Sequence, residues 1–284
     1  MKNTIFFLLV IIISSSCTER IDNLKLDSSV RRLVVEGIIT NESKAHQVKL
    51  SYTSDYFSDE PSPPATGATV LLMYNNQILE LEETIPGCYF TPDSFRGRPG
   101  VKYELNILGI DADEDGVNDE FTAENYLYPV TNIDSFHVMA REVWSSNFWE
   151  IGLYALEPGE TEDFYLIKIY KNGILLTDTL PEYSITDDLL FNGNYMWGVP
   201  VYYLDMERED ENLNNGDMIT FELSRISEDY YKFLVEAMDV YSGSNPLFSG
   251  PAANVYSNIS GNALGYFETL SVKRQYRYFS YSTK

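Results

Sequence analysis

The strongest constraint on the fold of this chain is a series of short segments in which apolar and polar residues alternate. In the clearest of them, 101–107, four apolar residues alternate with three polar ones. Successive side chains of a β-strand point to opposite faces of its sheet, so this pattern predicts a strand with one buried face. An amphipathic helix would instead repeat its apolar residues every three or four positions.

Similar segments recur along the chain, separated by turn residues such as Asn75-Asn76, Pro86-Gly87 and Asn172-Gly173. The 22 tyrosines and 15 phenylalanines also favour strands, because aromatic side chains fit a pleated, half-buried surface. Many short strands between turn signals predict β-sandwiches. The expected strands are 33–39, 46–52, 69–74, 78–82, 88–91, 101–107, 121–127, 136–143, 148–153, 164–170, 198–205 and 218–223.

One segment has the signals of a helix. Ser227 is a good N-cap, and the acids Glu228 and Asp229 favour the positive end of a helix dipole. We therefore expect a helix at about 228–240 with an apolar stripe along one side. The stripe would pack on a core, and the alternative is that it lines a groove for a ligand. The stripe comprises Tyr230, Leu234, Met238 and Tyr241.

Pro129 and the polar pair Thr131-Asn132 mark a boundary between two strand-rich halves, each long enough for an ordinary domain. We therefore predict a mainly β protein with two β-sandwich-like domains, the second carrying one inserted α-helix. The first domain would span 31–128 and the second 131–284.

The N-terminus has the layout of a secretory signal. Lys2 gives a positive start, 4–13 is almost wholly apolar, and three serines precede Cys17. The apolar run is too short to span a bilayer as a permanent helix. The segment resembles a bacterial lipoprotein signal, with 1–16 cleaved and acyl chains such as palmitate carried by Cys17. A plain signal peptide that ends near a cysteine is the alternative.

The net charge is −23, with 43 acidic and 20 basic residues. Such a chain repels phosphate backbones, so nucleic acid is not an expected partner. It would not adhere to anionic lipid either, so a lipid on Cys17 is the better explanation for membrane attachment, with 17–30 as a polar tether. If Cys17 is acylated, Cys88 has no partner for an intrachain disulfide.

The acidic segment 111–119 has ligand-like spacing. Acids at its first, third, fifth and ninth positions, with Gly116 at the sixth, follow the pattern of a calcium loop. Thr122 replaces the usual bidentate glutamate at position twelve, so binding would be weak, with a Kd of roughly 0.1–1 mM. The alternative is a solvated acidic hairpin tip. The expected Ca²⁺ ligands are Asp111, Asp113, Asp115, Asp119 and the carbonyl group of Val117.

Motifs for catalysis are not found. The chain has only two histidines, His46 and His137, and it contains no HExxH zinc motif, nucleophile elbow or phosphate-binding glycine loop. We therefore expect no enzymatic activity. Aromatic residues in two loop-like segments are the alternative source of function, since they can stack on sugars or anchor a protein partner. They can equally cap a sandwich core. These residues are Trp144, Trp149, Tyr195 and Trp197.

Two resemblances add to this reading. The elements 67–70, 87–89 and 100–105 make 31–128 similar to transthyretin-like or carboxypeptidase-regulatory-like sandwiches. Across the mature chain, five segments resemble a Bacteroidetes lipoprotein family, domain of unknown function forty-two forty-nine. They are 165–173, 216–220, 227–231, 254–259 and 265–267. The resemblance implies a neighbouring TonB-dependent outer-membrane receptor, and it carries over no site residues.

Together these observations predict an outer-membrane lipoprotein without enzymatic activity, held on the periplasmic or the cell-surface side by its lipid. It would be an accessory or ligand-binding partner of a TonB-dependent receptor in nutrient uptake. The alternative is a stand-alone cell-surface module that binds glycans or peptides.

Overall fold

Strands dominate the structure, a computed structural model that describes residues 31–54, 60–243 and 255–281. They account for 51% of it, about twice the share found in ordinary globular domains, which confirms a mainly β protein. The predicted signal peptide (1–16), the lipidation site Cys17 and the tether (17–30) lie outside the described residues.

Every predicted strand overlaps an observed one. The strands are β1 (Leu33–Thr40), β2 (Gln47–Tyr52), β3 (Thr69–Tyr74), β4 (Gln77–Glu80), β5 (Glu82–Ile85), β6 (Cys88–Phe90), β7 (Val101–Ile110), β8 (Asp119–Leu127), β9 (Ser135–Val143), β10 (Ser146–Leu156), β11 (Phe164–Lys171), β12 (Ile174–Leu175), β13 (Ser184–Asp187), β14 (Tyr195–Asp205), β15 (Met218–Ile226) and β16 (Leu264–Tyr278). The helical elements are the short 3-10 helix η1 (Leu180–Glu182) and the α-helix α2 (Glu228–Tyr241).

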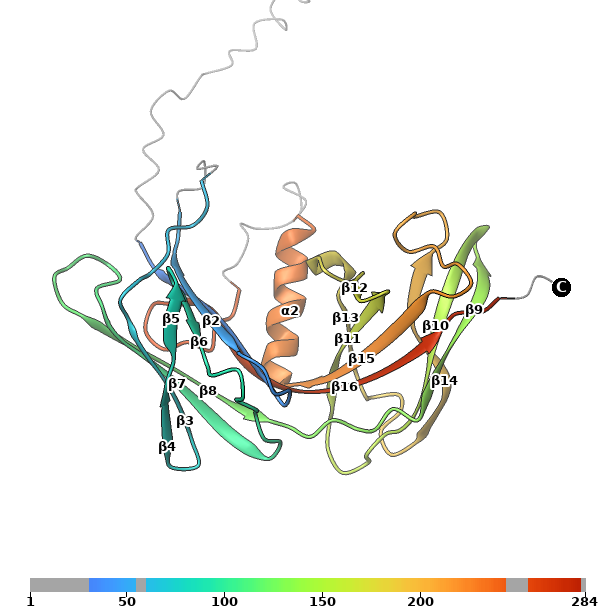
Figure 1. Cartoon of the computed structure of the whole chain (residues 1–284), viewed down its shortest axis with the longest axis horizontal. Coiled ribbons are helices and arrows are strands. Elements are labelled where there is room, and N and C mark those ends of the chain that lie inside the picture. Colours follow the sequence, from blue (N-terminus) through green and yellow to red (C-terminus); the bar gives the residue numbers. More distant parts are fainter. Residues whose placement is uncertain (1–30, 55–59, 244–254, 282–284) are drawn as a thin grey trace, which may run out of the picture.

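One long sheet runs through the molecule in the order β12-β11-β15-β16-β1-β2-β6-β5, with β13 paired to β11 (Figure 1). Its centre is a parallel pair of β1 and β16, from Val34 opposite Leu264 to Thr40 opposite Leu270. Gly265 lies within this pair with a φ of 90°, and a Cβ atom there would overlap the carbonyl oxygen of Val35. A glycine is therefore required for the two strands to meet.

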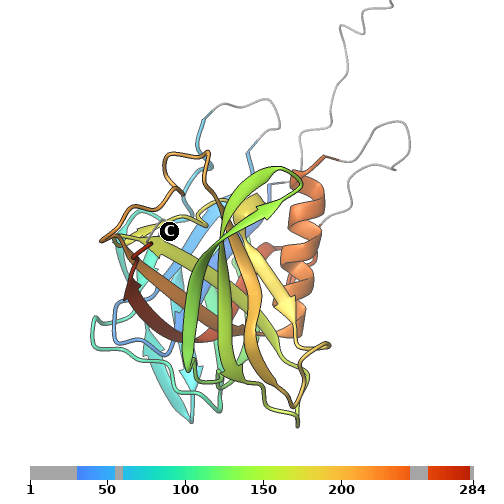
Figure 2. The same cartoon turned by 90° about the vertical axis from the view of Figure 1, so that its right-hand side faces the viewer.

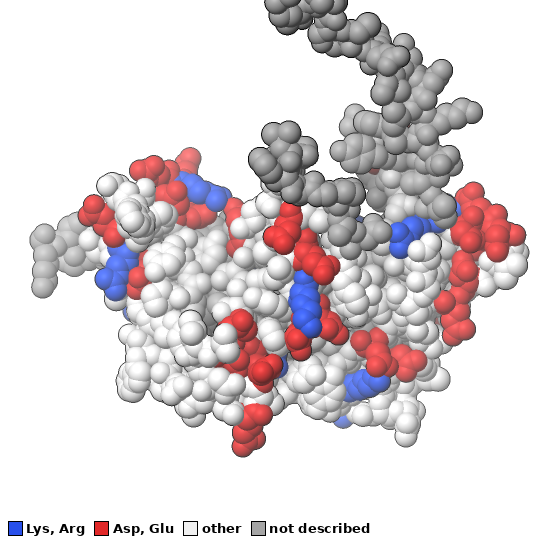
Figure 3. Space-filling model, turned by 180° about the vertical axis from the view of Figure 1, so that it is seen from behind, with Lys and Arg blue, Asp and Glu red and all other residues white. Residues whose placement is uncertain are grey.

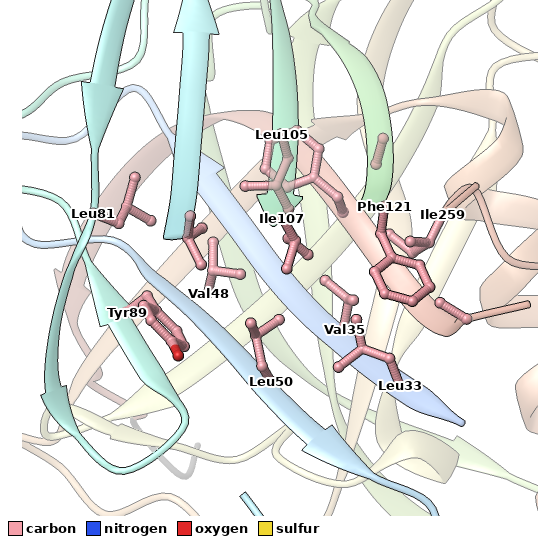
Figure 4. Packing of buried hydrophobic residues seen from close by; sticks show 14 of the residues in the cluster. Leu33, Val35, Val48, Leu50, Leu81, Tyr89, Leu105, Ile107, Phe121 and Ile259 are labelled. Carbon is pink, nitrogen blue, oxygen red and sulfur yellow. The ribbon is translucent and has the colours of Figure 1, made fainter. Parts of the chain in front are cut away.

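A second, four-stranded sheet, β4-β3-β7-β8, packs on one half of the long sheet. Figure 4 shows their shared core, in which side chains of β1 and β2 meet those of β7 and β8. Ile259, Ala263 and Phe267 from the far end of the chain belong to the same core. The core therefore combines residues from both ends of the described chain.

A third sheet, β14-β10-β9, packs on the other half of the long sheet. The core between these two sheets, which we call the second core, includes Ile151, Ile167 and Phe221. Odd-numbered residues of β16 point toward the two smaller sheets. Phe267 enters the core under the four-stranded sheet, and Arg277 donates a hydrogen bond to a carbonyl group of β9 in the three-stranded sheet. The division into domains at 31–128 and 131–284 stays a prediction, and the long sheet contains strands from both ranges.

The opposite face of the long sheet carries α2, which confirms the helix predicted at about 228–240. The hydroxyl oxygen of Ser227 accepts a hydrogen bond from the Tyr230 N–H group, as expected of an N-cap. Tyr230 and Leu234 are buried against even-numbered residues of β16. Tyr241 is exposed, so the predicted apolar stripe is too long at its C-terminal end.

The outer side of α2 is charged. Figure 3 shows a narrow column of acidic and basic side chains there, between broad uncharged surfaces. Lys232 pairs with Glu228 one turn away, at 2.7 Å between Nζ and Oε1. In the described part of the chain, no helix has the length and apolar character needed to cross a membrane.

Candidate functional site

A groove of about 730 Å³ lies on the helix-bearing face of the long sheet, beside α2. It forms because α2 packs on β11, β15 and β16, while the neighbouring β1 and β2 continue the sheet beyond it. We call it the helix groove. Its lining includes Ile38, Thr40, Glu42, Lys44, His46, Tyr170, Leu180, Tyr183, Glu222, Phe233, Ala237 and Arg274.

The floor of the helix groove is a network of paired charges. Arg274 Nε lies 2.6 Å from the buried Glu222 Oε2, and the same guanidinium forms an ion pair with Glu42. The hydroxyl of Tyr170 donates a hydrogen bond to Glu222 at 2.9 Å, and Lys44 pairs with Glu42 at 2.9 Å. The floor therefore offers fixed donors and acceptors whose charges are already balanced.

The wall of the helix groove is apolar. Phe233 and Ala237 project from α2, and Leu180 and Tyr183 come from η1 and the residue after it. An apolar wall beside a polar floor suits an amphipathic ligand, because the wall contributes burial and the floor sets orientation.

His46 lines the groove but is not poised as a base at neutral pH. Burial lowers its pKa to about 4, so the imidazole is uncharged. Its Nε2 lies 2.9 Å from the Thr40 hydroxyl, which is a hydrogen-bonding distance.

The structure brings three of the predicted calcium ligands together. Carboxylate oxygens of Asp111, Asp113 and Asp115 lie within 4.8 Å of one another, and Gly116 has a φ of 90°. Asp119 is not part of this group, and its Oδ2 accepts a hydrogen bond from the Ala112 N–H group at 2.9 Å. The group has three carboxylates in place of the four expected.

The loop's own backbone also binds these carboxylates. Asp111 accepts hydrogen bonds from the N–H groups of Asp115 and Gly116. The N–H group of Val117, whose carbonyl was the expected ligand, donates to Asp115 Oδ1 at 2.8 Å. This arrangement fits both readings of the loop, a weak calcium site and a solvated acidic tip.

The four predicted aromatic contacts lie in three different environments. Trp144 is 97% exposed, in the turn between β9 and β10. Trp149 is only 6% exposed, its ring packs on Phe279, and its indole N–H group donates to Asn212 at 3.2 Å. The prediction that Trp149 is a contact residue is therefore corrected: its side chain belongs to the core, because it points inward from β10.

Tyr195 and Trp197 lie together on β14, with ring centroids 4.5 Å apart. The Tyr195 hydroxyl donates a hydrogen bond to Asp134 at 2.8 Å, and Trp197 is 78% exposed. Trp197 pairs with Tyr154 near the end of β10, whereas Trp144 adjoins the beginning of that strand. The structure therefore does not bring Trp144 and Trp197 into one contact.

Trp197 belongs to a larger surface that the sequence reasoning missed. Directly paired residues of β9, β10 and β14 share the outer face of this sheet, which is turned to the viewer in Figure 2. We call it the aromatic face. Its residues are His137, Met139, Arg141, Phe148, Glu150, Tyr154, Trp197 and Tyr203.

At the centre of the aromatic face, the buried carboxylate of Glu150 pairs with Arg141 at 3.0 Å and accepts a hydrogen bond from Tyr203 at 3.4 Å. The aromatic face could have been predicted from the aromatic residues that recur at alternate positions of β10 and β14.

The fold and these surfaces define a mainly β protein of three sheets, with an amphipathic groove on one side and an aromatic face on another. Residues 21–276 match the family model described as "Domain of unknown function (DUF4249)", and the chain belongs to this family. This confirms the predicted domain family, whereas its lipoprotein character stays a prediction. No match to the chain was found among curated proteins.

Proposed function

We propose that the protein is a non-enzymatic lipoprotein of the outer membrane that binds a ligand in the helix groove. It would act with a TonB-dependent receptor in nutrient uptake, from the periplasmic or the cell-surface side. The observation that carries the proposal is the helix groove itself. Its volume, about 730 Å³, lies within the range of roughly 300–1,000 Å³ usual for ligand sites.

The chemistry of the groove favours binding over turnover. A general base needs an available lone pair and a pKa near the working pH. In the groove, Glu222 and Glu42 are engaged by Arg274, and the pKa of His46 is about 4. Such groups are suited to orienting a ligand's polar end.

The aromatic face is the contact surface that we propose for the receptor. Exposed tryptophan and tyrosine side chains contribute strongly to protein interfaces, since they bury a large area at a small cost in conformational entropy. Trp197 projects from this face, and Trp144 extends the same sheet at its hairpin tip. The groove lies on a different sheet, so a ligand and a receptor would not compete for one surface.

Filling the groove tests the ligand-binding part. Ala237→Trp should place an indole ring in the groove, whereas Val235→Trp adds the same ring at an exposed position of α2 outside its lining. Native mass spectrometry of protein purified from its own membranes should show a small molecule on the wild type and on Val235→Trp only. Equal ligand retention by both variants would contradict the groove as the site.

Site-specific crosslinking tests the receptor contact. A photoreactive residue at position 197 should crosslink to a β-barrel receptor in intact membranes. Position 174 on β12 is a matched control, because Ile174 is similarly exposed but lies on the edge of the long sheet. Crosslinks to the receptor from 174 and none from 197 would move the contact away from the aromatic face.

A stand-alone glycan-binding module is the second candidate, favoured by the adjacent rings of Tyr195 and Trp197. A sugar ring can pack on such exposed aromatic rings. Titration with an oligosaccharide panel would then quench tryptophan fluorescence in the wild type and not in Trp197→Ala. Without saturable quenching by any member of the panel, this candidate fails.

A further inference from the structure

Three buried carboxylates form a group that neither the helix groove nor the aromatic face uses. Glu157 follows β10, Asp163 precedes β11 and Asp188 follows β13. They are 2%, 5% and 4% exposed, and one oxygen of each lies within 4.8 Å of the others. Like charges buried this close together are unfavourable unless a positive charge or a proton opposes them.

The protein supplies part of that opposition. Arg225 Nη2 lies 2.6 Å from Asp163 Oδ1, and the hydroxyl of Tyr165 donates a hydrogen bond to Glu157 Oε1 at 2.7 Å. Two further oxygens, Glu157 Oε2 and Asp188 Oδ2, are buried without any hydrogen-bond partner. Buried carboxylate oxygens rarely remain unpaired, so these two point to a ligand that the protein itself does not provide.

The charges indicate what that ligand is. Three carboxylates and the Arg225 guanidinium leave a net charge of −2. One divalent cation would balance this charge completely.

We propose that Glu157, Asp163 and Asp188 bind one divalent cation of the hard, oxygen-preferring class, with Ca²⁺ ahead of Mg²⁺. Ca²⁺ accepts six to eight oxygen ligands in a flexible geometry, which suits three carboxylates held by the fold, whereas Mg²⁺ requires a near-ideal octahedron. The three side chains offer only oxygen ligands, which Ca²⁺ prefers to softer donors.

The surroundings can complete the coordination shell. A cavity of about 260 Å³ inside the second core is lined by Glu157, Asp188 and Tyr165, by the polar residues Ser184, Thr186 and Asp187, and by apolar side chains. Water in this cavity would supply the further ligands that a six- to eight-coordinate ion needs.

The ion would tie three chain segments together. The backbone already aligns them, because the Asp188 N–H group donates to the Asp163 carbonyl oxygen at 3.0 Å, and the Glu157 N–H group donates to Asn194 at 3.0 Å. Binding would fix the end of β10 to the β11–β13 edge of the long sheet. We therefore expect the ion to stabilise the second core and with it the base of the aromatic face.

The test uses the full chain purified in detergent and treated with a chelator. The double substitution Asp111→Asn with Asp115→Asn serves as the background, so that the exposed acidic loop does not contribute. Ca²⁺ should raise the melting temperature of this background protein and bind with a stoichiometry of one. Terbium, a Ca²⁺ substitute, should luminesce when tyrosine is excited, because Tyr165 contacts the site.

Adding Glu157→Gln and Asp188→Asn to the background should weaken binding at least about tenfold. In chelator, this variant should melt no lower than the background, because it loses uncompensated buried charge. Glu162→Gln, at an exposed acid next to Asp163 and outside both the group and the cavity lining, is the matched control and should respond to Ca²⁺ like the background. Equal Ca²⁺ shifts with and without the two substitutions would overturn the proposal. So would the absence of any shift at about 10 mM Ca²⁺, well above the Kd of weak extracellular sites.

Discussion

The side-chain amide of Asn125 on β8 donates a hydrogen bond to the buried carboxylate of Glu268 on β16, with 2.6 Å between Nδ2 and Oε2. The same carboxylate accepts hydrogen bonds from the backbone N–H group and the hydroxyl of Ser227, the N-cap of α2. One buried acid therefore joins the four-stranded sheet, the long sheet and the helix that forms the groove wall.

This position of Glu268 makes the stability of the protein depend on pH. Burial raises the pKa of Glu268 from 4.5 to about 8, although its hydrogen bonds from Ser227 and Asn125 act in the opposite direction. Between these pH values the folded state holds a proton that the unfolded state releases. The stabilisation is therefore complete below about pH 4.5 and is lost as the pH rises through about 8.

We accordingly predict that Glu268→Gln flattens the pH dependence of the free energy of unfolding between pH 5 and 8.5. Each unit of pKa difference corresponds to ~1.4 kcal/mol. Urea unfolding at several pH values measures the slope. Glu124→Gln, at an exposed residue next to Asn125, should keep the wild-type slope. A Glu268→Gln slope equal to that of the wild type would show that this acid does not control the pH dependence.

The parallel pairing of β1 with β16 should depend on Gly265. Gly265→Ala combines a positive φ with overlap of the Val35 carbonyl oxygen, so we expect a loss of at least ~3 kcal/mol in unfolding free energy. Gly173→Ala is the control, since its φ is also positive but no atom lies within 4 Å of the added Cβ. It should cost about 1–2 kcal/mol, from backbone strain alone. Equal losses would mean that the close approach is unimportant.

The acidic loop is expected to bind Ca²⁺ weakly. At a Ca²⁺ concentration ten times Kd, the gain in stability is only ~1.4 kcal/mol, so the ion would order the loop without being needed for folding. Millimolar Ca²⁺ should raise the melting temperature more for the wild type than for Asp111→Asn with Asp115→Asn. If Mg²⁺ and Ca²⁺ shift both proteins equally, charge screening explains the effect and the loop is a solvated tip.

Lipidation is a prediction from the sequence. Cys17→Ser should release the protein from membranes into the soluble fraction, because the chain carries a net charge of −23 and has little affinity for anionic lipid. Fractionation and the mass of the mature N-terminus measure this directly. Continued membrane retention together with an unchanged N-terminal mass would rule out the lipid.

The sequence predicts best the strands that have one apolar and one polar face. The alternating segment 101–107 becomes β7, and Asn172-Gly173 forms the two-residue turn between β11 and β12 with positive φ at both residues. β16 escaped prediction because residues 266–272 are buried on both faces, against the core of the four-stranded sheet and against α2, so exposed polar residues do not alternate there.

The candidate sites were harder to predict than the strands. Trp149 lies on β10 and points into the core, whereas Trp144 lies in the turn before that strand. A shift of one position along a strand moves a side chain from core to solvent, so the aromatic residue types alone do not distinguish these environments. Glu157 and Asp163 lie at the two ends of the loop between β10 and β11, and Asp188 follows β13, so no spacing in the sequence marks this group. The acids of 111–119 are adjacent in sequence, which is why they alone stood out.

Recovery of partners from native membranes in mild detergent tests the proposed receptor partnership most directly. The account predicts that the wild type and Ile174→Ala co-purify with an outer-membrane β-barrel receptor, identified by mass spectrometry. The double variant Trp144→Ala with Trp197→Ala should lose most of it, because both indole rings are exposed and their removal leaves the cores intact. Absence of any barrel receptor from the wild-type sample, with the protein folded and membrane-bound, would contradict the account.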